Sequence, residues 1–393
     1  MTFTIKTFNA IAEKGINLLK ESNFDVSDSH DSPDAIILRS HKLQEEDLGG
    51  SLKAIARAGA GVNNVPVDIC SIKGIPVFNT PGANANAVKE IVLAALLISS
   101  RGLFAGANFV NSIEGIDKGD LKPHIESGKK DFKGRELKGA TLGVIGMGAI
   151  GAQVADMGVM LGMNVIGYDP AISVEAAWKL PNKVQRKESI EEVFKESDYI
   201  SLHVPANDNT KGLIDNKLLK ESKKGLRLIN FARDEIVVSG DIIKNLSDGV
   251  LAKYISDFAD LELITRAKDK SDVIILPHIG ASTSQAEENC AVMAAEQIED
   301  YLLNGNIKNS VNFPDLLEPR VSEYRLTISN KNQAGLIGKF TTVLAENKLN
   351  IVDMVNKSRG DIAYNVIDLE SKPSNDIFEQ LQSLEDVIKV REV

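Results

Sequence analysis

Short apolar runs alternate with longer amphipathic stretches along most of the chain. Runs of about four to eight apolar residues that end in glycine, proline or a polar residue are typical of buried strands, whereas longer periodic stretches are typical of helices. This alternation predicts an α/β fold in which helices cover both faces of a mostly parallel sheet. In the first 95 residues we expect strands at 4–7, 35–38, 54–56 and 76–79 and helices at 10–20 and 88–100.

The same alternation returns after residue 139 and predicts a second doubly wound, Rossmann-like unit. Its expected strands are 142–145, 164–168, 199–205, 225–231, 251–258 and 273–276, and its expected helices are 152–161, 189–196, 213–219 and 285–303. Because ligands of open α/β sheets bind beyond the carboxyl ends of the strands, the polar residues at these ends are site candidates. These residues are Asp169, His203, Arg233, Asp257 and His278.

The residues after 323 follow a different pattern, which predicts a separate module. The expected strands are 324–329, 351–357, 362–369 and 386–392, and the expected helices are 338–347 and 377–384. This βαββαβ order is that of a ferredoxin-like fold. The predicted organisation is a first α/β domain at 1–95 and 285–312, a Rossmann-like domain at 96–284, a proline-containing linker at 313–322 and a C-terminal module at 323–393.

Residues 99–139 interrupt the alternation with a polar, glycine-rich segment. A helix followed by a long excursion fits this pattern. Two interpretations remain open, namely a contact with a second copy of the chain and a solvated face. The cations of the segment include Arg101, Lys118, Lys122, Lys129, Lys130 and Arg135.

The segment 142–151 combines a strand, a glycine turn and the start of a helix. Gly146, Gly148 and Gly151 have the spacing G-x-G-x-x-G, which permits a tight turn, a close approach to a pyrophosphate and close packing of helix on strand.

The second strand of this unit ends in Asp169, near the separation from the glycines expected of an acid that binds the ribose of a dinucleotide. A carboxylate repels a 2′-phosphate, and the next cation along the chain is Lys179. The sequence therefore predicts NAD rather than NADP. A doubly wound domain without a nucleotide is the alternative.

Composition and charge exclude several classes of partner. The 393 residues are 43% apolar and carry a formal net charge of −10, without a basic stripe that would favour nucleic acid. The apolar run at 91–98 is too short to span a membrane, and the N-terminus lacks the apolar core of a signal peptide. Cys70 and Cys290 stand alone, without the spacing of metal ligands. We therefore expect a cytoplasmic protein with no metal site, no nucleic-acid partner and no membrane association.

An enzyme that uses a nicotinamide cofactor needs a proton carrier and a group that holds the substrate carbonyl. His278 suits the first task because imidazole titrates near neutral pH. Arg233 can clamp a carboxylate, and Glu262 can orient the histidine. A structural ion pair with a capping histidine is the alternative. Arg57 and the loop 79–86 follow strands of the first domain. They either bind an anion or only form the turns there.

The sequence resembles the D-isomer-specific 2-hydroxyacid dehydrogenases over essentially its whole length. The segments that carry the likeness are 142–151, 230–233, 257–262 and 277–283. The resemblance implies that Arg233 binds the substrate carboxylate and carbonyl. It also implies that His278 is the acid–base residue and that Glu262 hydrogen-bonds it.

The resemblance implies further roles around the cofactor and the substrate. Asp257 would contact the nicotinamide carboxamide. The other implied cofactor-binding residues are Gly146, Gly148, Ala149, Ile150, Gly151, Asp169, His203, Val204, Pro205, Thr210, Phe231, Ala232, His278 and Gly280. The implied substrate-binding residues are Arg57, Asn84, Ala85, Asn86, Arg233 and His278. Two departures stand out, because Ala149 replaces an arginine of many relatives and no proline follows Glu262.

The C-terminal module resembles an ACT regulatory domain. The turn at 332–335 matches the N-x-P-G turn of that domain, with alanine in place of proline. Asn332 and Asn350 match positions that bind an amino-acid effector, and Asn330 occupies a site that is histidine in some serine-sensitive relatives. Since ACT ligands usually bind between paired domains, the resemblance implies a homodimer or homotetramer with an effector such as L-serine.

Within the family, the likeness is to members that act on D-3-phosphoglycerate. We therefore expect NAD-dependent oxidation of D-3-phosphoglycerate to 3-phosphohydroxypyruvate, the first step of L-serine biosynthesis. Another D-2-hydroxyacid such as 2-hydroxyglutarate is the alternative substrate. A regulator that binds NAD without catalysis is the alternative of a different class, and the presence of Arg233, Glu262 and His278 together argues against it.

Overall fold

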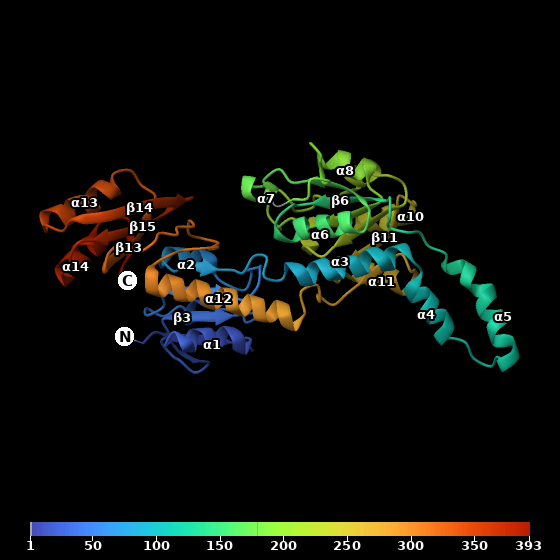
Figure 1. Ribbon diagram of the computed structural model, residues 1–393, viewed down its shortest axis with the longest axis horizontal. Helices are drawn as coiled ribbons and strands as arrows, with labels where there is room; N and C mark the ends of the chain where they lie inside the picture. Colours follow the sequence, from blue (N-terminus) through green and yellow to red (C-terminus); the bar gives the residue numbers. More distant parts are fainter. Residues whose placement is uncertain (1, 179) are drawn as a thin grey trace. The chain divides into compact units, whose positions relative to one another are not determined.

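The computed structural model describes residues 2–178 and 180–393 (Figure 1). The chain divides into two compact units, unit 1 with Met1–Asn84 and Ser284–Val393 and unit 2 with Ala85–Thr283. Unit 1 holds a five-stranded parallel sheet and a four-stranded antiparallel sheet, and unit 2 holds a seven-stranded parallel sheet. The predicted α/β class, with two doubly wound sheets and a small C-terminal module, is therefore confirmed.

The five-stranded sheet of unit 1 has the order β2-β1-β3-β4-β5, a common order of doubly wound folds. Successive residues of β3 point to opposite faces, so Ile37 joins the core under α1 and α12 whereas Ile36 joins the core that contains Cys70 of α2. Its strands are β1 (Thr4–Phe8), β2 (Asp25–Ser27), β3 (Ala35–Leu38), β4 (Ala54–Arg57) and β5 (Val77–Phe78). Its helices are α1 (Glu13–Glu21), α2 (Val67–Ile72), α12 (Ser284–Asn304) and the 3₁₀ turn η1 (Glu45–Asp47).

The seven-stranded sheet of unit 2 has the order β12-β11-β10-β9-β6-β7-β8. Its first six strands in the chain follow the 3-2-1-4-5-6 order of dinucleotide-binding folds, which reverses between β6 and β9. Its strands are β6 (Thr141–Ile145), β7 (Asn164–Tyr168), β8 (Gln185–Arg186), β9 (Tyr199–Leu202), β10 (Leu226–Asn230), β11 (Leu251–Ser256) and β12 (Val273–Ile275).

Helices cover both faces of this sheet. One core contains buried residues of α3 and α6, and the other contains buried residues of α8, α9, α10 and α11. The helices are α3 (Ala85–Ser100), α6 (Ala149–Met160), α7 (Val174–Trp178), α8 (Ile190–Glu196), α9 (Asn216–Lys220), α10 (Ser239–Ser247), α11 (Leu261–Asp269) and the 3₁₀ turn η3 (Asp234–Ile236).

The segment 101–133 forms a helical arm that extends away from the sheet of unit 2 (Figure 1). It consists of α4 (Leu103–Asn111), α5 (Lys118–Gly128) and the 3₁₀ turn η2 (Lys129–Phe132). Neither α4 nor α5 has a buried residue, and Leu103 and Phe104 are each 52% exposed. At the base of the arm, cations gather around a hollow of about 510 Å³. The hollow is lined by Arg101, Lys129, Lys130, Phe132, Lys133, Gly134, Arg135 and Glu136.

The C-terminal module, residues 323–393, has the sheet order β14-β15-β13-β16 with antiparallel pairs throughout. Phe340 of α13 and Leu381 of α14 are fully buried against the apolar side chains of β13 and β15, such as Ile328 and Ile367. The elements are β13 (Tyr324–Lys331), α13 (Leu336–Glu346), β14 (Ile351–Arg359), β15 (Ile362–Leu369), α14 (Asn375–Ser383) and β16 (Val387–Glu392). The predicted ferredoxin-like order is confirmed.

The structure shifts two predicted boundaries. The division expected at residue 95 lies inside α3, because Val88, Val92 and Leu96 of this helix pack in a core of unit 2. The stretch 313–322 is only partly a linker, because Phe313 is 0% and Leu316 is 1% exposed in the core of unit 1. Prolines prevent a helix there, but they do not prevent packing.

Among the residues described, no single helix is long and apolar enough to cross a membrane. The pair α3 and α4, bent by 67° at the break between them, reaches the necessary length and composition only when the two helices are taken together.

Candidate active site

Three glycines shape the loop between β6 and α6. Gly146 has a φ of +88°, and a Cβ there would lie 2.7 Å from the carbonyl carbon of His203, which follows β9. A Cβ on Gly151 would lie 1.9 Å from the carbonyl oxygen of Gly146. Gly148, by contrast, has open space where its Cβ would be, and no side chain caps the helix after it. This cradle at a helix N-terminus, with Ala149 and Ile150 in its first turn, fits the diphosphate of a dinucleotide.

Asp169 lies at the end of β7, beside this loop. Its Oδ2 accepts a hydrogen bond from the N–H of Met147 at 2.8 Å, and its Oδ1 accepts one from the N–H of Ala171 at 2.9 Å. The carboxylate is therefore oriented next to the glycine loop, as a ribose-binding role requires. Lys179, the next cation after Asp169 along the chain, lies outside the described residues.

The chain after β9 forms a compact loop on the other side of the point where the strand order reverses. The hydroxyl of Ser201 lies 2.8 Å from Nε2 of His203, and Thr210 Oγ1 donates to the carbonyl of Pro205 at 2.5 Å. Burial lowers the pKa of His203 to about 3, so its imidazole is neutral at physiological pH. The backbone nitrogen of Val204 lies 2.9 Å from the hypothetical Cβ of Gly146, so this loop lies directly beside the glycine loop.

Asn230 holds the turn that follows β10. Its Oδ1 accepts the N–H of Ala232 at 3.0 Å, and its Nδ2 donates to the carbonyl of Arg233 at 2.8 Å. Phe231 and Ala232 are buried, and the half-buried guanidinium of Arg233 donates to the carbonyl of Ala232 at 2.6 Å. In the sequence Asn230 is only part of a motif. In the structure its side chain holds the backbone of the turn that carries Arg233.

Asp257 fastens the loop that carries His278. Its backbone carbonyl accepts the N–H of His278 at 3.1 Å, and its two carboxylate oxygens accept the N–H groups of Ile279 at 2.8 Å and Gly280 at 2.6 Å. A Cβ on Gly280 would lie 2.8 Å from Oδ2 of Asp257, so the glycine allows this approach. Each oxygen can still accept a second bond, so the implied contact with the nicotinamide carboxamide stays a prediction.

His278 itself is exposed and has a φ of +56°, an uncommon conformation for a residue with a side chain. Its ring lies edge-on to that of Phe258, with the centroids 5.1 Å apart. Strained backbone of this kind persists where the surroundings hold it, and it is frequent at functional sites.

Glu262 is exposed in the first turn of α11, where its N–H is bonded to Oδ1 of Asp260 at 2.9 Å. Within the described part of the chain, no hydrogen bond joins Glu262 to His278. The expected pairing is therefore absent from this structure. Because catalytic hydrogen bonds often tighten only in a substrate complex, the role of Glu262 stays a prediction.

In unit 1, Arg57 ends β4 and its Nε donates to the carbonyl of Arg39 at 3.1 Å. Its guanidinium lies over Gly59, where a Cβ would come within 1.7 Å of Nη1 and displace it. Oδ1 of Asn84 is buried and has no hydrogen-bond partner among the described residues. Both side chains remain candidates for binding a polar substrate.

Ala85 and Asn86 belong to unit 2, because α3 begins at Ala85 and not at residue 88. Ala85 is fully buried, and Asn86 bonds within the first turn of the helix, to Glu90 at 2.8 Å and Lys89 at 2.5 Å. The predicted loop therefore ends at Asn84, and the methyl group of Ala85 packs in the protein instead of facing a ligand.

The three effector candidates lie at two ends of the C-terminal sheet. Asn330 is buried and accepts a bond from Asn365 at 2.8 Å, and Asn332 donates to the carbonyl of Gly360 at 3.2 Å near the end of β13. Asn350 precedes β14, whose first residue pairs with Leu369 at the C-terminal end of β15. Asn330, by contrast, pairs with the start of β15. At about 3.3 Å per residue, Asn350 lies roughly 20 Å or more from the other two along the sheet.

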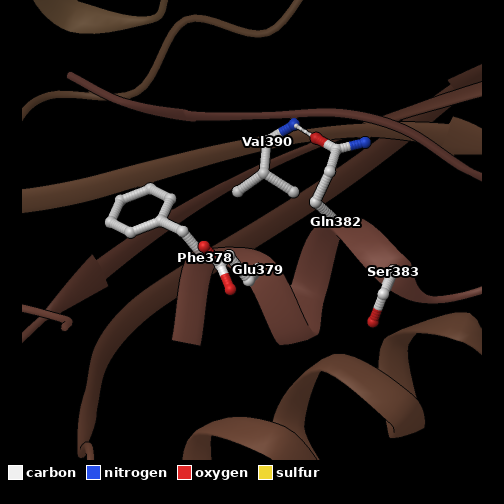
Figure 2. Close-up of a pocket in the computed structure, with 5 residues that line it drawn as sticks. All are labelled: Phe378, Glu379, Gln382, Ser383 and Val390. Atoms are coloured by element: carbon white, nitrogen blue, oxygen red, sulfur yellow. Dashed lines mark hydrogen bonds between the residues drawn. The ribbon is translucent and has the colours of Figure 1, made fainter. Parts of the chain in front are cut away.

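A hollow of about 420 Å³ lies between α14 and β16 of this module (Figure 2). Gln382 donates to the carbonyl of Ile388 at 3.1 Å and accepts the N–H of Val390 at 2.8 Å, so its amide is engaged within the protein. None of the three asparagines lines the hollow. Its lining residues are Phe378, Glu379, Gln382, Ser383 and Val390.

Comparisons with known proteins identify the family. Residues 99–280 match the model of the D-isomer specific 2-hydroxyacid dehydrogenase, NAD binding domain. The chain is 31% identical over 340 residues to D-3-phosphoglycerate dehydrogenase of Haemophilus influenzae, which covers 84% of this chain and 78% of that protein. The chain belongs to the D-isomer-specific 2-hydroxyacid dehydrogenase family.

Two further relatives agree. The D-3-phosphoglycerate dehydrogenase of Synechocystis sp. is 33% identical over 323 residues, which cover 78% of this chain but only 56% of that longer protein. The crystal structure of NAD+-bound 3-phosphoglycerate dehydrogenase of Entamoeba histolytica has a TM-score of 0.62 at 30% identity, over 80% of this chain and 100% of that one. Since the matched family domain binds NAD and contains the glycine loop and Asp169, the prediction of NAD as the cofactor is confirmed.

Proposed function

We propose that this chain oxidises D-3-phosphoglycerate to 3-phosphohydroxypyruvate with NAD, the first step of L-serine biosynthesis. The observation that carries the proposal is the loop at 278–280, which Asp257 holds at the carboxyl edge of a sheet whose glycine loop fits a dinucleotide. The names of the Haemophilus influenzae and Entamoeba histolytica relatives support the choice of substrate.

The proposed roles follow the chemistry of each side chain. His278 accepts the proton of the C2 hydroxyl as the carbonyl forms, and Arg233 binds the carboxylate and the carbonyl oxygen. NAD, when bound, supplies the hydride acceptor. Glu262 hydrogen-bonds His278 in the substrate complex and orients its ring, and its place in the first turn of a helix suits a negative charge.

The phosphate end of the substrate needs cations, and Arg57 of unit 1 is the proposed one. Asn84 adds an amide with an acceptor still available. The proposed cofactor-binding set lies in the glycine loop, after β7, in the loop after β9, in the turn after β10, after β11 and in the loop that carries His278. It comprises Gly146, Gly148, Ala149, Ile150, Gly151, Asp169, His203, Val204, Pro205, Thr210, Phe231, Ala232, Asp257, His278 and Gly280.

We also propose that the chain forms a homodimer or homotetramer in the cytoplasm and that its C-terminal module is an ACT domain with an amino-acid effector. The separation of Asn350 from Asn330 and Asn332 supports pairing, because these side chains can meet around one ligand only if a second copy supplies part of the set. The exposed apolar residues of the helical arm, such as Leu103 and Phe104, support a contact between copies.

The test is loss of NADH absorbance with 3-phosphohydroxypyruvate as the substrate, compared with 2-oxoglutarate and pyruvate. We expect turnover that prefers the phosphorylated substrate, and we expect His278→Ala to lower kcat by about 100- to 10,000-fold while NADH binding stays nearly unchanged. A preference for 2-oxoglutarate supports the rival 2-hydroxyacid activity. Absence of turnover with every substrate, together with NADH binding, supports a silent regulator.

A further inference from the structure

The C-terminal end of α12 is covered by arginines that come from outside the helix. The last carbonyls of a helix have no hydrogen-bond partner within it. Here Arg391 of β16 donates to the carbonyl of Leu302 at 3.4 Å, Arg320 donates to that of Leu303 at 3.3 Å, and Arg325 of β13 donates to that of Asn304 at 3.0 Å. Positive charge at this end also complements the helix dipole.

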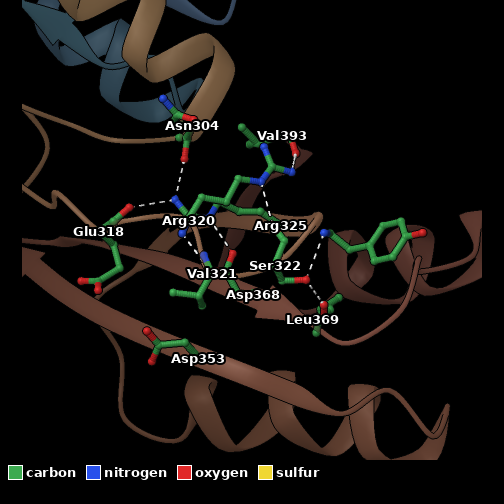
Figure 3. Close-up of polar contacts among 12 residues, drawn as sticks. Asn304, Glu318, Arg320, Val321, Ser322, Arg325, Asp353, Asp368, Leu369 and Val393 are labelled. Carbon is green, nitrogen blue, oxygen red and sulfur yellow. Dashed lines mark hydrogen bonds and ion pairs between the residues drawn. The ribbon is translucent and has the colours of Figure 1, made fainter.

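Arg325 is the centre of this cap. Its side chain is fully buried, and all of its N–H donors are used (Figure 3). Besides Asn304, its Nη groups donate to the carbonyls of Glu318 and Pro319 at 3.0 Å each, and its Nε and Nη2 donate to Asp368 of β15 at 2.6 and 2.8 Å. One side chain thus joins the helix end, the segment before the module and two of its strands.

Asp368 completes the charge balance of this buried arginine. It also accepts the N–H of Val321 at 3.0 Å. Burial favours its neutral form, but the hydrogen bonds from Arg325 and from Val321 outweigh burial and hold the pKa of Asp368 below its usual value. The charge of the buried guanidinium is therefore balanced by a carboxylate in direct contact with it.

Further contacts from β15 and β16 reach the same helix end. The Tyr364 hydroxyl, on β15, donates to the carbonyl of Gly305 at 2.7 Å, and Gly305 has a φ of +72°. The guanidinium of Arg391 lies 4.3 Å from the ring centroid of Tyr301, an attractive cation–π contact. Phe313 packs edge-on against the ring of Tyr364, with the centroids 6.0 Å apart. The stretch between helix and module is therefore packed and does not have the contacts of a free hinge.

The N-terminal end of α12 lies close to His278 along the chain. The helix begins at Ser284, six residues after His278, and the loop between them joins unit 2 to unit 1. A helix of 21 residues is about 30 Å long and stiff over that length. A change that orders or loosens the C-terminal end of α12 therefore acts on a helix whose N-terminal end continues directly into the loop with His278.

We propose that the C-terminal module serves as the cap of α12 and that Arg325 couples the module through this helix to the His278 loop. Arg325 is a positioning residue and touches neither substrate nor cofactor. A change of conformation in the module then reaches the loop because the module and α12 move as one body. The effect on turnover rests on the proposed function, whereas the effect on the helix does not.

The test combines hydrogen exchange of the full-length protein with kinetics. Arg325→Lys keeps the charge but loses the planar fork, and Tyr364→Phe removes a single hydroxyl while keeping the packed ring. Lys331→Met is the matched control, because Lys331 is an exposed cation on the same strand with only a surface ion pair to Asp386. Exchange is measured at amides 298–305 and 284–290, with NADH affinity and the kcat and KM for 3-phosphohydroxypyruvate alongside.

For Arg325→Lys and Tyr364→Phe we expect exchange about tenfold faster at both ends of α12, a lower kcat and an unchanged NADH affinity, and no effect of Lys331→Met. Faster exchange confined to 298–305 with unchanged kcat means that the cap is only local and overturns the coupling. Unchanged exchange at 298–305 overturns the cap itself. Faster exchange at both ends in a chain that turns over none of the substrates supports the coupling and refutes only the proposed activity.

Discussion

The carboxylate of Asp257 accepts a hydrogen bond from the backbone N–H of Gly280 at 2.6 Å, and this bond links the end of β11 to the loop that carries His278. Oδ1 of the same residue accepts the N–H of Ile279 at 2.8 Å. The backbone N–H of His278 donates to the carbonyl of Asp257 at 3.1 Å, and His278 has a φ of +56°. The backbone position of the proposed acid–base residue therefore depends on Asp257, which follows the neighbouring strand β11.

The first prediction concerns this anchor. In Asp257→Asn, one oxygen becomes an NH₂ group and faces a loop N–H, so one of the two bonds is lost. We expect kcat/KM to fall about 10- to 100-fold, because small displacements of a catalytic group are costly. Steady-state kinetics measure the fall, and energy transfer from Trp178, the single tryptophan, to NADH reports whether the cofactor still binds. Asp260→Asn is the control, because Asp260 accepts similar backbone bonds at the start of α11, and an equal loss in that variant contradicts the assignment.

The second prediction separates two glycines of one motif. A methyl group on Gly148 enters open space, whereas a methyl group on Gly151 meets the backbone carbonyl of Gly146 at 1.9 Å. We expect Gly148→Ala to fold with a nearly unchanged Tm but to bind NADH at least about tenfold more weakly, since it fills the space beside the helix N-terminus. We expect Gly151→Ala to lose about 2 kcal/mol or more of stability from overpacking. Thermal melts and NADH titrations check both, and full NADH affinity in Gly148→Ala speaks against a diphosphate in this cradle.

The third prediction is a pH dependence with a defined sign. Burial lowers the pKa of His203 to about 3, whereas in the unfolded chain it has its ordinary value of 6.5. Between these values the unfolded state binds the extra proton, so stability falls as the pH drops below 6.5. At pH 5 this relation lowers the free energy of unfolding by about 2 kcal/mol.

His203→Gln removes the titrating group, so we expect its Tm to depend less on pH between 7 and 5 than that of the wild type. His124→Gln is the control, because His124 is exposed on the helical arm and stacks only on Phe109. Differential scanning fluorimetry across this range measures the slopes. Parallel slopes in the wild type and His203→Gln count against a neutral, buried imidazole.

The sequence predicted the sheets well, because buried parallel strands are short apolar runs with clear ends. Residues 35–38, 164–168 and 362–369 are strands in the structure with the predicted bounds. The sequence did not reveal α2, α10 and α11, whose amphipathic faces are short and begin beside loops with polar residues. Helix starts were also early or late by a few residues, as at α3, where the polar Asn84 and Asn86 obscure a buried Ala85.

The candidate site was predictable to the extent that it consists of strand ends. Because parallel strands end at one edge, Asp169, Arg233 and His278 could be named from order alone. Hydrogen bonds between side chains and the backbone leave no such pattern in the sequence. The anchoring of the 278–280 loop by Asp257 and the cap of α12 by Arg325 depend on pairs 23 and 21 residues apart, and only coordinates reveal them.

The last prediction addresses the proposed effector site. If a ligand binds between two antiparallel copies of the C-terminal sheet, each site takes Asn332 from one copy and Asn350 from the other, because in one chain they lie at opposite ends. Asn332→Ala and Asn350→Ala each remove all sites from a homodimer. A mixed dimer of the two variants keeps one intact site and one doubly altered site. We therefore expect L-serine to inhibit or stabilise the mixed dimer, with about half the wild-type sites by calorimetry, and to leave both variant homodimers unaffected.

Copies with two different tags, purified over one tag and then the other, give the mixed dimer. The control is a dimer of the wild type and a chain that carries both substitutions. Each of its two sites then has one altered half. A wild type whose activity and melting temperature are both unchanged at millimolar L-serine refutes the effector, and the module is then structural. Loss of the response in the mixed dimer alongside a response in the wild type would instead show that each site lies within one chain, against the separation of Asn332 and Asn350 along the sheet.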